Sequence, residues 1–174
     1  MKVVAFGASS SSESINKKLA TYASSLLQNV EVEILDLNDF ELPLFSVDKE
    51  KELGQAEAAQ AFLTKIESAD LLIISFAEHN GTYTAAYKNL YDWVSRIKQK
   101  VFEDKKVLLL ASSPGPGGAK NVLASAARSL PHFGAEIIGQ LSIPKFFDNF
   151  DTEKNLLSNK ELKDQLLQLI SHVE

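Results

Sequence analysis

Short apolar runs alternate along the chain with longer segments in which every third or fourth residue is apolar. The runs at residues 3–6, 71–74 and 107–110 are almost wholly apolar. Strands of this kind are covered by helices on both faces and lie in the middle of a parallel sheet. The segments 30–36 and 136–143 instead alternate apolar with polar residues, as strands with one wetter face do. The pattern therefore predicts five strands, at residues 2–7, 30–36, 70–76, 106–112 and 136–143.

The segments between these strands have the period of amphipathic helices. Their apolar stripes run from Ile15 to Leu27, Ala59 to Ile66, Leu90 to Ile97, Val122 to Leu130 and Leu162 to Val173. Strands that alternate with helices form a mainly parallel sheet. We expect one α/β domain over residues 1–174. Because strands 2 and 5 look peripheral, its core would be a doubly wound, five-stranded parallel sheet in the order 2-1-3-4-5, with helices on both faces.

Small and hydrogen-bonding residues gather in three of the predicted loops. The loops at residues 8–16, 78–83 and 112–118 follow strands 1, 3 and 4, whereas the loops that return to the next strand are short and plain. All strand-to-helix loops of a parallel sheet lie at its carboxyl edge, and ligands bind there where the strand order reverses. We therefore expect a ligand site at this edge, between strands 1 and 3.

The first of these loops reads A-S-S-S-S-E-S-I-N over residues 8–16. It leads from a buried strand into a helix, and hydroxyls and free amides at the positive end of a helix can bind a phosphate. The loop has neither the G-x-G-x-x-G of dinucleotide sites nor the Gly-Lys-Ser/Thr of a P-loop, which favours a monophosphate held by side-chain hydroxyls. The alternative is a flexible connection with an ordinary serine N-cap.

The other two loops carry weaker signals. The glycines of residues 112–118 would let a planar ligand approach the backbone, although they could equally form a plain turn before a helix. In the second loop, Glu78 could be an acid at a helix N-terminus, His79 a surface histidine and Asn80-Gly81 an ordinary turn. A shared ligand site is the favoured interpretation because these loops follow neighbouring strands.

Composition argues against several kinds of site. The net charge of −5 and the pI near 5.3 argue against a nucleic-acid surface. The chain has no cysteine, and His79, His132 and His172 are too scattered to suggest a metal cluster. The first residues lack a signal-peptide pattern, and no stretch approaches the roughly 20 apolar residues of a membrane span. We expect a cytoplasmic enzyme or binding protein.

At the three loops the chain resembles the NAD(P)H-dependent FMN reductase family, which includes quinone, azo-dye and chromate reductases. The family's G-S-x-R-x-x-S-x-N is similar to residues 8–16, and its P-E-Y-N-G-[ST] is similar to residues 77–82. A helix ending K-N-x-x-D-W corresponds to residues 88–93, and S-P-G-G-x-G-G to residues 113–118, which are one residue shorter. The L-P-L-F of residues 42–45 also resembles the family. The similarity covers nearly the whole chain and implies a flavodoxin-like fold.

The resemblance implies that these loops bind FMN. The serines and Asn16 of the first loop would hold the phosphate, the second loop would line one side of the isoalloxazine, and the third loop its pyrimidine side. The cofactor-binding residues implied are Ser9, Ser11, Ser14, Ile15, Asn16, Glu78, His79, Asn80, Gly81, Ser113, Pro114, Gly115, Gly117 and Gly118. The resemblance implies no metal and no catalytic residue of the protein, because N5 of the flavin carries the chemistry.

Three residues depart from the family pattern. Ser11 stands where the family has arginine, Ala77 where it has proline and His79 where it has tyrosine. Loss of the arginine removes a permanent charge from the phosphate or pyridine-nucleotide region, which leaves the choice between NADPH and NADH open. Hydroxyls, amides and the helix end remain for FMN.

The implied function is an oxidoreductase that passes hydride from NADPH or NADH through FMN to a quinone or similar small acceptor. The alternatives are a flavodoxin-like electron carrier, although the T-x-T-G-x-T loop of flavodoxins is absent, and a non-catalytic flavin-binding or sensor domain. Members of the family are usually dimers or tetramers. Since Tyr83, Tyr87, Tyr91 and Trp93 lie close together on the third predicted helix, we expect a homodimer or homotetramer to which this helix contributes. The alternative is that these aromatics pack internally or rim the flavin.

Overall fold

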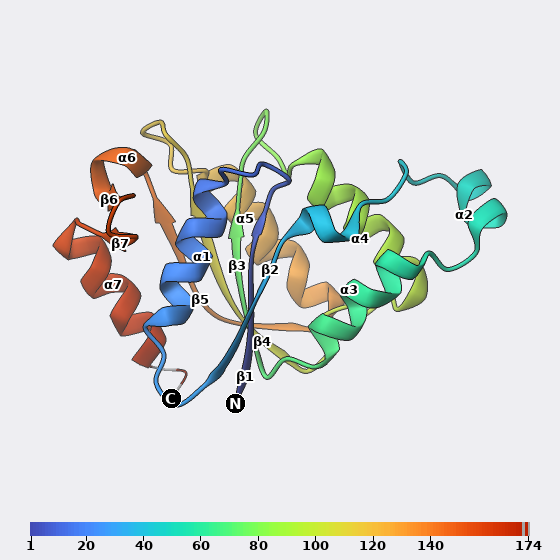
Figure 1. Cartoon of the computed structure of the whole chain (residues 1–174), viewed down its shortest axis with the longest axis horizontal. Coiled ribbons are helices and arrows are strands. Elements are labelled where there is room, and N and C mark those ends of the chain that lie inside the picture. The colour runs from blue at the N-terminus through green and yellow to red at the C-terminus, as the bar shows by residue number, and fades with distance from the viewer. Residues whose placement is uncertain (172, 174) are drawn as a thin grey trace.

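The computed structural model confirms the predicted parallel sheet (Figure 1). It describes residues 1–171 and 173, so His172 lies outside the described residues. The five strands pair in the order β2-β1-β3-β4-β5, and every neighbouring pair is parallel. The strands are β1 Lys2–Ala8, β2 Glu31–Leu35, β3 Leu71–Phe76, β4 Lys105–Ser112 and β5 Ala135–Ile143.

Helices cover both faces of the sheet, as the apolar central strands require. Val4 and Phe6 belong to the core on one face and Val3 and Ala5 to the core on the other, and all four are fully buried. Helices α3, α4 and α5 pack on the first face, and α1 and α7 pack on the second (Figure 1). The helices are α1 Ile15–Ser25, α3 Glu57–Glu67, α4 Ala85–Ile97, α5 Lys120–Ser129 and α7 Lys160–Ser171. Of the helices in the described residues, none has both the length and the apolar composition to span a bilayer.

All five predicted helices are present, with four corrections to their extent. The predicted stripes include Leu27, Leu130 and Val173, which lie beyond the ends of α1, α5 and α7. Tyr83 precedes α4 instead of lying on it. The apolar period does not predict several short elements. Helix α2, for example, buries none of its residues and therefore has no apolar stripe. These elements are η1 Leu37–Phe40, α2 Val47–Leu53, η2 Leu130–Phe133, α6 Phe146–Asn149, β6 Phe150–Asp151 and β7 Leu156–Leu157.

The backbones of β1 and α1 are in contact at Gly7, just before the first loop. A Cβ atom at this position would lie 2.4 Å from the backbone nitrogen of Lys17 and 2.8 Å from the carbonyl carbon of Asn16. Only glycine, which has no Cβ, allows so close an approach. The contact sets the position of the N-terminus of α1 relative to the end of β1.

Two of the four aromatic residues expected at an interface pack inside the protein. Tyr87 and Trp93 are almost wholly buried. The ring of Tyr87 lies 5.3 Å from that of Phe76, and the ring of Trp93 lies 5.3 Å from that of Phe45, measured between ring centroids. Tyr87 and Trp93 therefore do not indicate an interface with another protein, whereas Tyr83 and Tyr91 are partly exposed, and the predicted interface stays a prediction.

Candidate functional site

The loops after β1, β3 and β4 meet at the carboxyl edge of the sheet and enclose a cavity of about 250 Å³. The predicted cofactor-binding residues that line it are Ser9, Ser11, Ser14, Ile15, Asn16, Glu78, His79, Ser113 and Pro114. The predicted residues Asn80, Gly81, Gly115, Gly117 and Gly118 do not line it. Glu13, Ala77 and Ser112 also line the cavity and are additions to the predicted set. Their position in the chain, directly beside predicted residues, is the one signal that could have indicated them.

Two serine hydroxyls of the first loop keep their hydrogens available for a ligand. Ser14 is the N-cap of α1, and its Oγ accepts a hydrogen bond from the N–H of Lys17 at 3.1 Å. The Oγ of Ser9 accepts a hydrogen bond from the N–H of Ser11, also at 3.1 Å. A hydroxyl that accepts one hydrogen bond can still donate its own hydrogen to another acceptor. Each serine can therefore donate to a ligand while it stabilises the loop.

The first turn of α1 adds backbone donors to these hydroxyls. Ile15 and Asn16 occupy the first two helical positions, where an α-helix offers no acceptor for the N–H groups. The positive end of the helix macrodipole lies at the same place. This set of hydroxyl and N–H donors suits a phosphate group, so the residues present fit the phosphate of FMN.

The side chain of Asn16 has a role within the protein that the sequence does not predict. Its Oδ1 accepts hydrogen bonds from the Ser75 hydroxyl at 2.7 Å and from the Ser112 N–H at 2.9 Å, and its Nδ2 donates to the Ser112 carbonyl at 3.1 Å. The residue is 2% exposed. The two acceptor positions of the amide oxygen are thus used to join α1 to the ends of β3 and β4. The backbone N–H of Asn16, in the first turn of α1, is available as a donor to a phosphate, while the side chain already makes three hydrogen bonds within the protein.

Glu78 connects the second loop to the third. Its carboxylate accepts hydrogen bonds from the Val122 N–H at 2.9 Å and from Nδ2 of Asn121 at 3.3 Å. Helix α5 has no side-chain cap of its own, because its N-cap position is Ala119, in the left-handed conformation. Glu78 supplies the missing acceptor and charge for that helix N-terminus. Its carboxylate thus anchors the start of α5 while the residue lines the cavity.

The rest of the second loop is a tight hairpin. His79 and Thr82 exchange two backbone hydrogen bonds, and Asn80 and Gly81 between them have φ of 52° and 80°. Positive φ at both central residues is typical of a type I′ turn, for which Asn-Gly is the preferred pair. Asn80 and Gly81 form the exposed tip, which explains why they stand above the cavity and do not line it. The hydroxyl of Thr84 then donates to the Ala8 carbonyl at 2.9 Å and ties this loop to the first.

The glycines of the third loop divide into two kinds. A Cβ on Gly115 or Gly117 would meet nothing within 4 Å, so the backbone there is open to a ligand. Gly118 has φ of +60°, and a Cβ on it would lie 2.3 Å from Oγ of Ser142. The structure therefore requires glycine at position 118 for packing against the end of β5, which is a different reason from the predicted access for a ligand.

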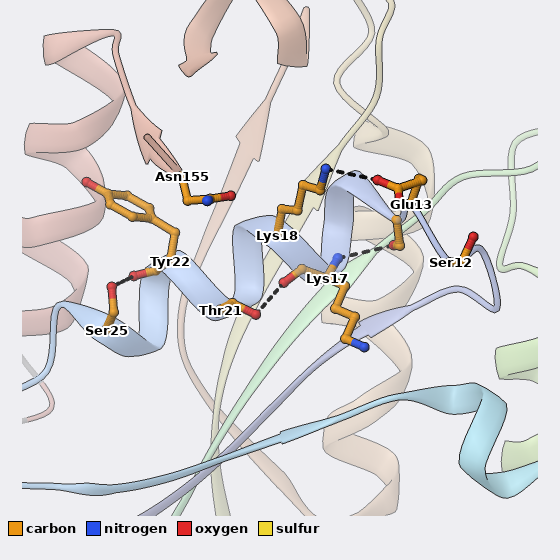
Figure 2. Close-up of a pocket in the computed structure, with 9 residues that line it drawn as sticks. Ser12, Glu13, Lys17, Lys18, Thr21, Tyr22, Ser25 and Asn155 are labelled. Atoms are coloured by element: carbon orange, nitrogen blue, oxygen red, sulfur yellow. Dashed lines mark hydrogen bonds and ion pairs between the residues drawn. The ribbon is translucent and has the colours of Figure 1, made fainter. Parts of the chain in front are cut away.

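Two lysines near the first loop are engaged in ion pairs. Lys17 pairs with Asp36, and this hydrogen bond is the main reason why the pKa of the Asp36 carboxyl is lowered. Lys18 pairs with Glu13 at 3.2 Å. Both lysines line a hollow of about 460 Å³ beside α1. Figure 2 shows Lys18 reaching towards Glu13, with the amine of Lys17 directed the other way. Both ammonium groups are thus already paired with a carboxylate.

The K-N-x-x-D-W residues of α4 hold the L-P-L-F segment in place. Nδ2 of Asn89 donates to the carbonyls of Leu42 and Pro43 at 3.1 and 3.0 Å, and its Oδ1 accepts the N–H of Phe45 at 2.8 Å. The indole N–H of Trp93 donates to the Pro43 carbonyl at 2.8 Å. The two motifs are therefore parts of one structural unit at the side of the candidate site.

Comparison with known proteins agrees with this geometry. The model of the family described as NADPH-dependent FMN reductase matches residues 1–148, a range that includes all three loops. The chain belongs to this family. The predicted membership of the NADPH-dependent FMN reductase family is thereby confirmed, and its motif residues are the ones that build the cavity and the segment beside it.

Two curated relatives and one solved structure illustrate the similarity. The chain is 27% identical to an NAD(P)H-dependent FMN reductase of Pseudomonas aeruginosa, over 98% of this chain and 93% of the relative. It is 28% identical to an NAD(P)H:quinone oxidoreductase of Solanum tuberosum, over 80% and 72%. The structure of the flavoenzyme NAD(P)H:(acceptor) oxidoreductase FerB from Paracoccus denitrificans aligns with a TM-score of 0.77 at 22% identity, over 98% and 93% of the two chains. The last comparison shows the shared fold.

Proposed function

We propose that this protein is an FMN-dependent oxidoreductase that accepts hydride from NADPH or NADH and reduces a quinone or similar small molecule. The observation that carries the proposal is the set of hydroxyl and N–H donors at the start of α1, which faces a cavity bounded by three loops. The family membership and the names of the relatives support it. When bound, FMN supplies the redox chemistry.

The residues of the chain bind and orient in this proposal. Ser9, Ser14 and the first N–H groups of α1 hold the phosphate of FMN. The second and third loops flank its ring system, with Gly115 and Gly117 leaving the backbone accessible. Backbone N–H groups of the third loop can stabilise negative charge on the pyrimidine side of the ring, which is an electrostatic contribution. No side chain has to act as an acid or base.

The direct test is to identify the cofactor and then to reduce it. Heat should release FMN as a single species on chromatography, because the first loop suits one phosphate and no dinucleotide fingerprint is present. Addition of NADPH or NADH without oxygen should bleach the flavin absorption at once. Release of FAD, or no flavin even after incubation with excess FMN, would contradict the proposal. Bound FMN that neither nucleotide bleaches would indicate an electron carrier.

Replacement of Ser14 by alanine should weaken FMN binding. The loss of one buried hydroxyl partner of a phosphate costs about 1–3 kcal/mol, which is about fivefold to more than hundredfold in Kd. Ser46→Ala is the matched control, because Ser46 caps α2 through the same bond, with its Oγ accepting the Lys49 N–H at 3.1 Å. Fluorescence titration with FMN should separate the two variants. Equal affinity of folded Ser14→Ala and parent would place the phosphate elsewhere.

Replacement of Ser11 by arginine should favour NADPH. Arginine binds phosphate with two parallel hydrogen bonds, and Lys17 and Lys18 are held by carboxylates. A charge-assisted contact of about 1.5–3 kcal/mol should lower the KM for NADPH by tenfold to about a hundredfold, and the KM for NADH less. Steady-state kinetics with both nucleotides and one quinone measure this. Equal changes for both nucleotides, or none, would remove Ser11 from the account of nucleotide preference.

We also propose that the protein is cytoplasmic, where nicotinamide nucleotides are available.

We propose further that the protein forms a homodimer or homotetramer. Support for the oligomer comes from the segment that leaves the body of the protein around α2 (Figure 1), which exposes Leu44, Val47 and Leu53. Helix α4 would contribute through Asn89, which anchors this segment. Light scattering at micromolar concentration should give at least twice the monomer mass, and a monomeric mass would contradict the proposal.

A further inference from the structure

The segment that follows β5 lies against the third loop of the candidate site, at the carboxyl edge of the sheet (Figure 1). The N–H of Lys145 donates to the carbonyl of Gly115 at 2.9 Å, and the N–H of Phe146 donates to that of Ser113 at 3.0 Å. Two consecutive N–H groups thus bind the third loop. Because Ser113 lines the cavity, side chains of this segment lie close to any ligand that reaches the cavity from this side.

The backbone of Lys145 is in the left-handed conformation, with φ of 45°. Of the described residues other than glycine that have a positive φ, four are asparagine or aspartate, and Ala119 and Lys145 are the other two. Glycine, asparagine and aspartate adopt this conformation most readily. Residues held in such a conformation gather at functional sites. A lysine at this position therefore indicates that its side chain has a use that offsets the cost.

Lys145 and Lys120 are exposed cations on either side of the third loop, and Lys120 begins α5. A Cβ on Gly118 would lie 3.1 Å from Cα of Pro144, so each lysine is within two residues of one close contact. In the part of the chain that the structure describes, neither ammonium group forms an ion pair or hydrogen bond. The carboxylate of Glu78 is bonded to a backbone N–H of α5. The two ammonium groups are therefore available to an anion.

An exposed aromatic ring accompanies the two cations. Phe147, in α6, is 62% exposed. Its ring meets that of the fully buried Phe146 almost at a right angle, with centroids 5.4 Å apart, and Phe146 stacks on Phe150 at 4.6 Å. The buried rings hold Phe147 in place while most of it remains exposed. An aromatic ring held in this way can stack on a nucleobase.

Two free cations and an exposed ring match the adenosine diphosphate half of a nicotinamide nucleotide. The pyrophosphate supplies the negative charges, and adenine supplies a planar face. Beside the first loop, by contrast, Lys17 and Lys18 are both paired with carboxylates. Asp148, the acid of α6, forms no ion pair with Lys145 within the described residues. The free positive charge near the cavity thus lies on the side of the third loop.

We propose that Lys120, Lys145 and Phe147 bind the adenosine diphosphate half of NADPH or NADH. The lysines would pair with the pyrophosphate, and the ring of Phe147 would stack on adenine. The third loop lies between this surface and the cavity, so the nicotinamide would extend over that loop towards the flavin. The inference rests on the proposed function, because it concerns the hydride donor of the same site. It accounts for nucleotide binding without the arginine that the family has at position 11.

The first test measures binding of ADP-ribose to the FMN-loaded protein by isothermal titration calorimetry. ADP-ribose has the adenosine and pyrophosphate of both nucleotides but no nicotinamide, so its binding does not require hydride transfer. Lys120→Gln and Lys145→Gln should each weaken binding about twofold to fivefold, and the double variant about fivefold to twentyfold, as expected for exposed charge pairs. Lys106→Gln is the matched control, because Lys106 is exposed, has no partner among the described residues and lies near the start of β4, at the opposite edge of the sheet.

The second test concerns the aromatic ring. Phe147→Ala should weaken ADP-ribose binding at least fivefold, as expected for the loss of base stacking, whereas Phe147→Tyr keeps the ring and should bind like the parent. No binding by the parent at millimolar ADP-ribose, or unchanged binding by the double lysine variant or by Phe147→Ala, would overturn the inference. Failure of the proposed function would be seen separately, as bound FMN that neither NADPH nor NADH bleaches. Bleaching with unchanged ADP-ribose affinity in these variants would overturn this inference alone.

Discussion

Replacement of Gly7 by alanine is expected to destabilise the protein by about 3 kcal/mol or more, which lowers Tm by about 6–12 °C. The added Cβ would lie 2.4 Å from the backbone nitrogen of Lys17. A backbone atom cannot move aside as the end of a side chain can, so α1 must shift away from β1. FMN affinity should fall together with stability, because Ser14 and the first N–H groups of α1 move with the helix.

The control for this variant is Gly117→Ala. Gly117 has open space around it and no positive φ, so alanine there should leave Tm within about 2 °C of the parent. Thermal unfolding followed by circular dichroism, together with FMN titration, would measure both effects. A Gly7→Ala variant as stable as Gly117→Ala would show that the contact between β1 and α1 relaxes easily.

Replacement of Asn16 by alanine is expected to cost about 3 kcal/mol of stability. The change leaves the Ser75 hydroxyl and the Ser112 N–H and carbonyl without their partner in a buried position. Each unpaired buried group costs about 1–3 kcal/mol, and relaxation or entry of water recovers part of this. Denaturant unfolding should show the loss in the absence of FMN as well as in its presence. A stable variant with weak FMN binding would instead indicate that the Asn16 side chain contacts the phosphate.

Replacement of Asn16 by aspartate would test the same contacts through pH. Burial raises the pKa of such a carboxyl in the folded state above its unfolded value of about 3.9. The protonated acid can still donate to the Ser112 carbonyl, whereas the anion cannot and is buried without a counter-charge. The variant should therefore be most stable relative to the parent at low pH, and it should lose stability as pH rises through the folded-state pKa.

Asn155→Asp is the control for the pH experiment. Asn155 is exposed and has a φ of 52°, a conformation that aspartate tolerates as asparagine does. Its stability should follow that of the parent across the pH range. An Asn16→Asp variant that behaves in the same way would contradict the buried network inferred for Asn16.

The sequence alone determined the sheet and the edge at which the site lies. A continuous apolar run marks a strand covered on both faces, and an alternating run marks a peripheral strand. The sequence shows this because the faces on which a strand is buried determine which of its positions are apolar. That difference places strands 2 and 5 at the edges, and the common doubly wound arrangement then gives the order β2-β1-β3-β4-β5. The position of the candidate site follows as well, since every loop after a parallel strand lies at the same edge. The apolar period does not predict α2, because a helix that buries none of its residues has no stripe to detect.

The role of each site residue was decided by the tertiary structure. A motif shows which residues stand in a loop, whereas a hydrogen bond depends on atoms brought together from distant parts of the chain. Asn16 is bonded to Ser112, 96 positions away, and Glu78 to the start of α5, 44 positions away. Gly118 is required by the end of β5, which no pattern within its own loop reveals. Local sequence thus located the site, while long-range packing determined which of its groups remain free for a ligand.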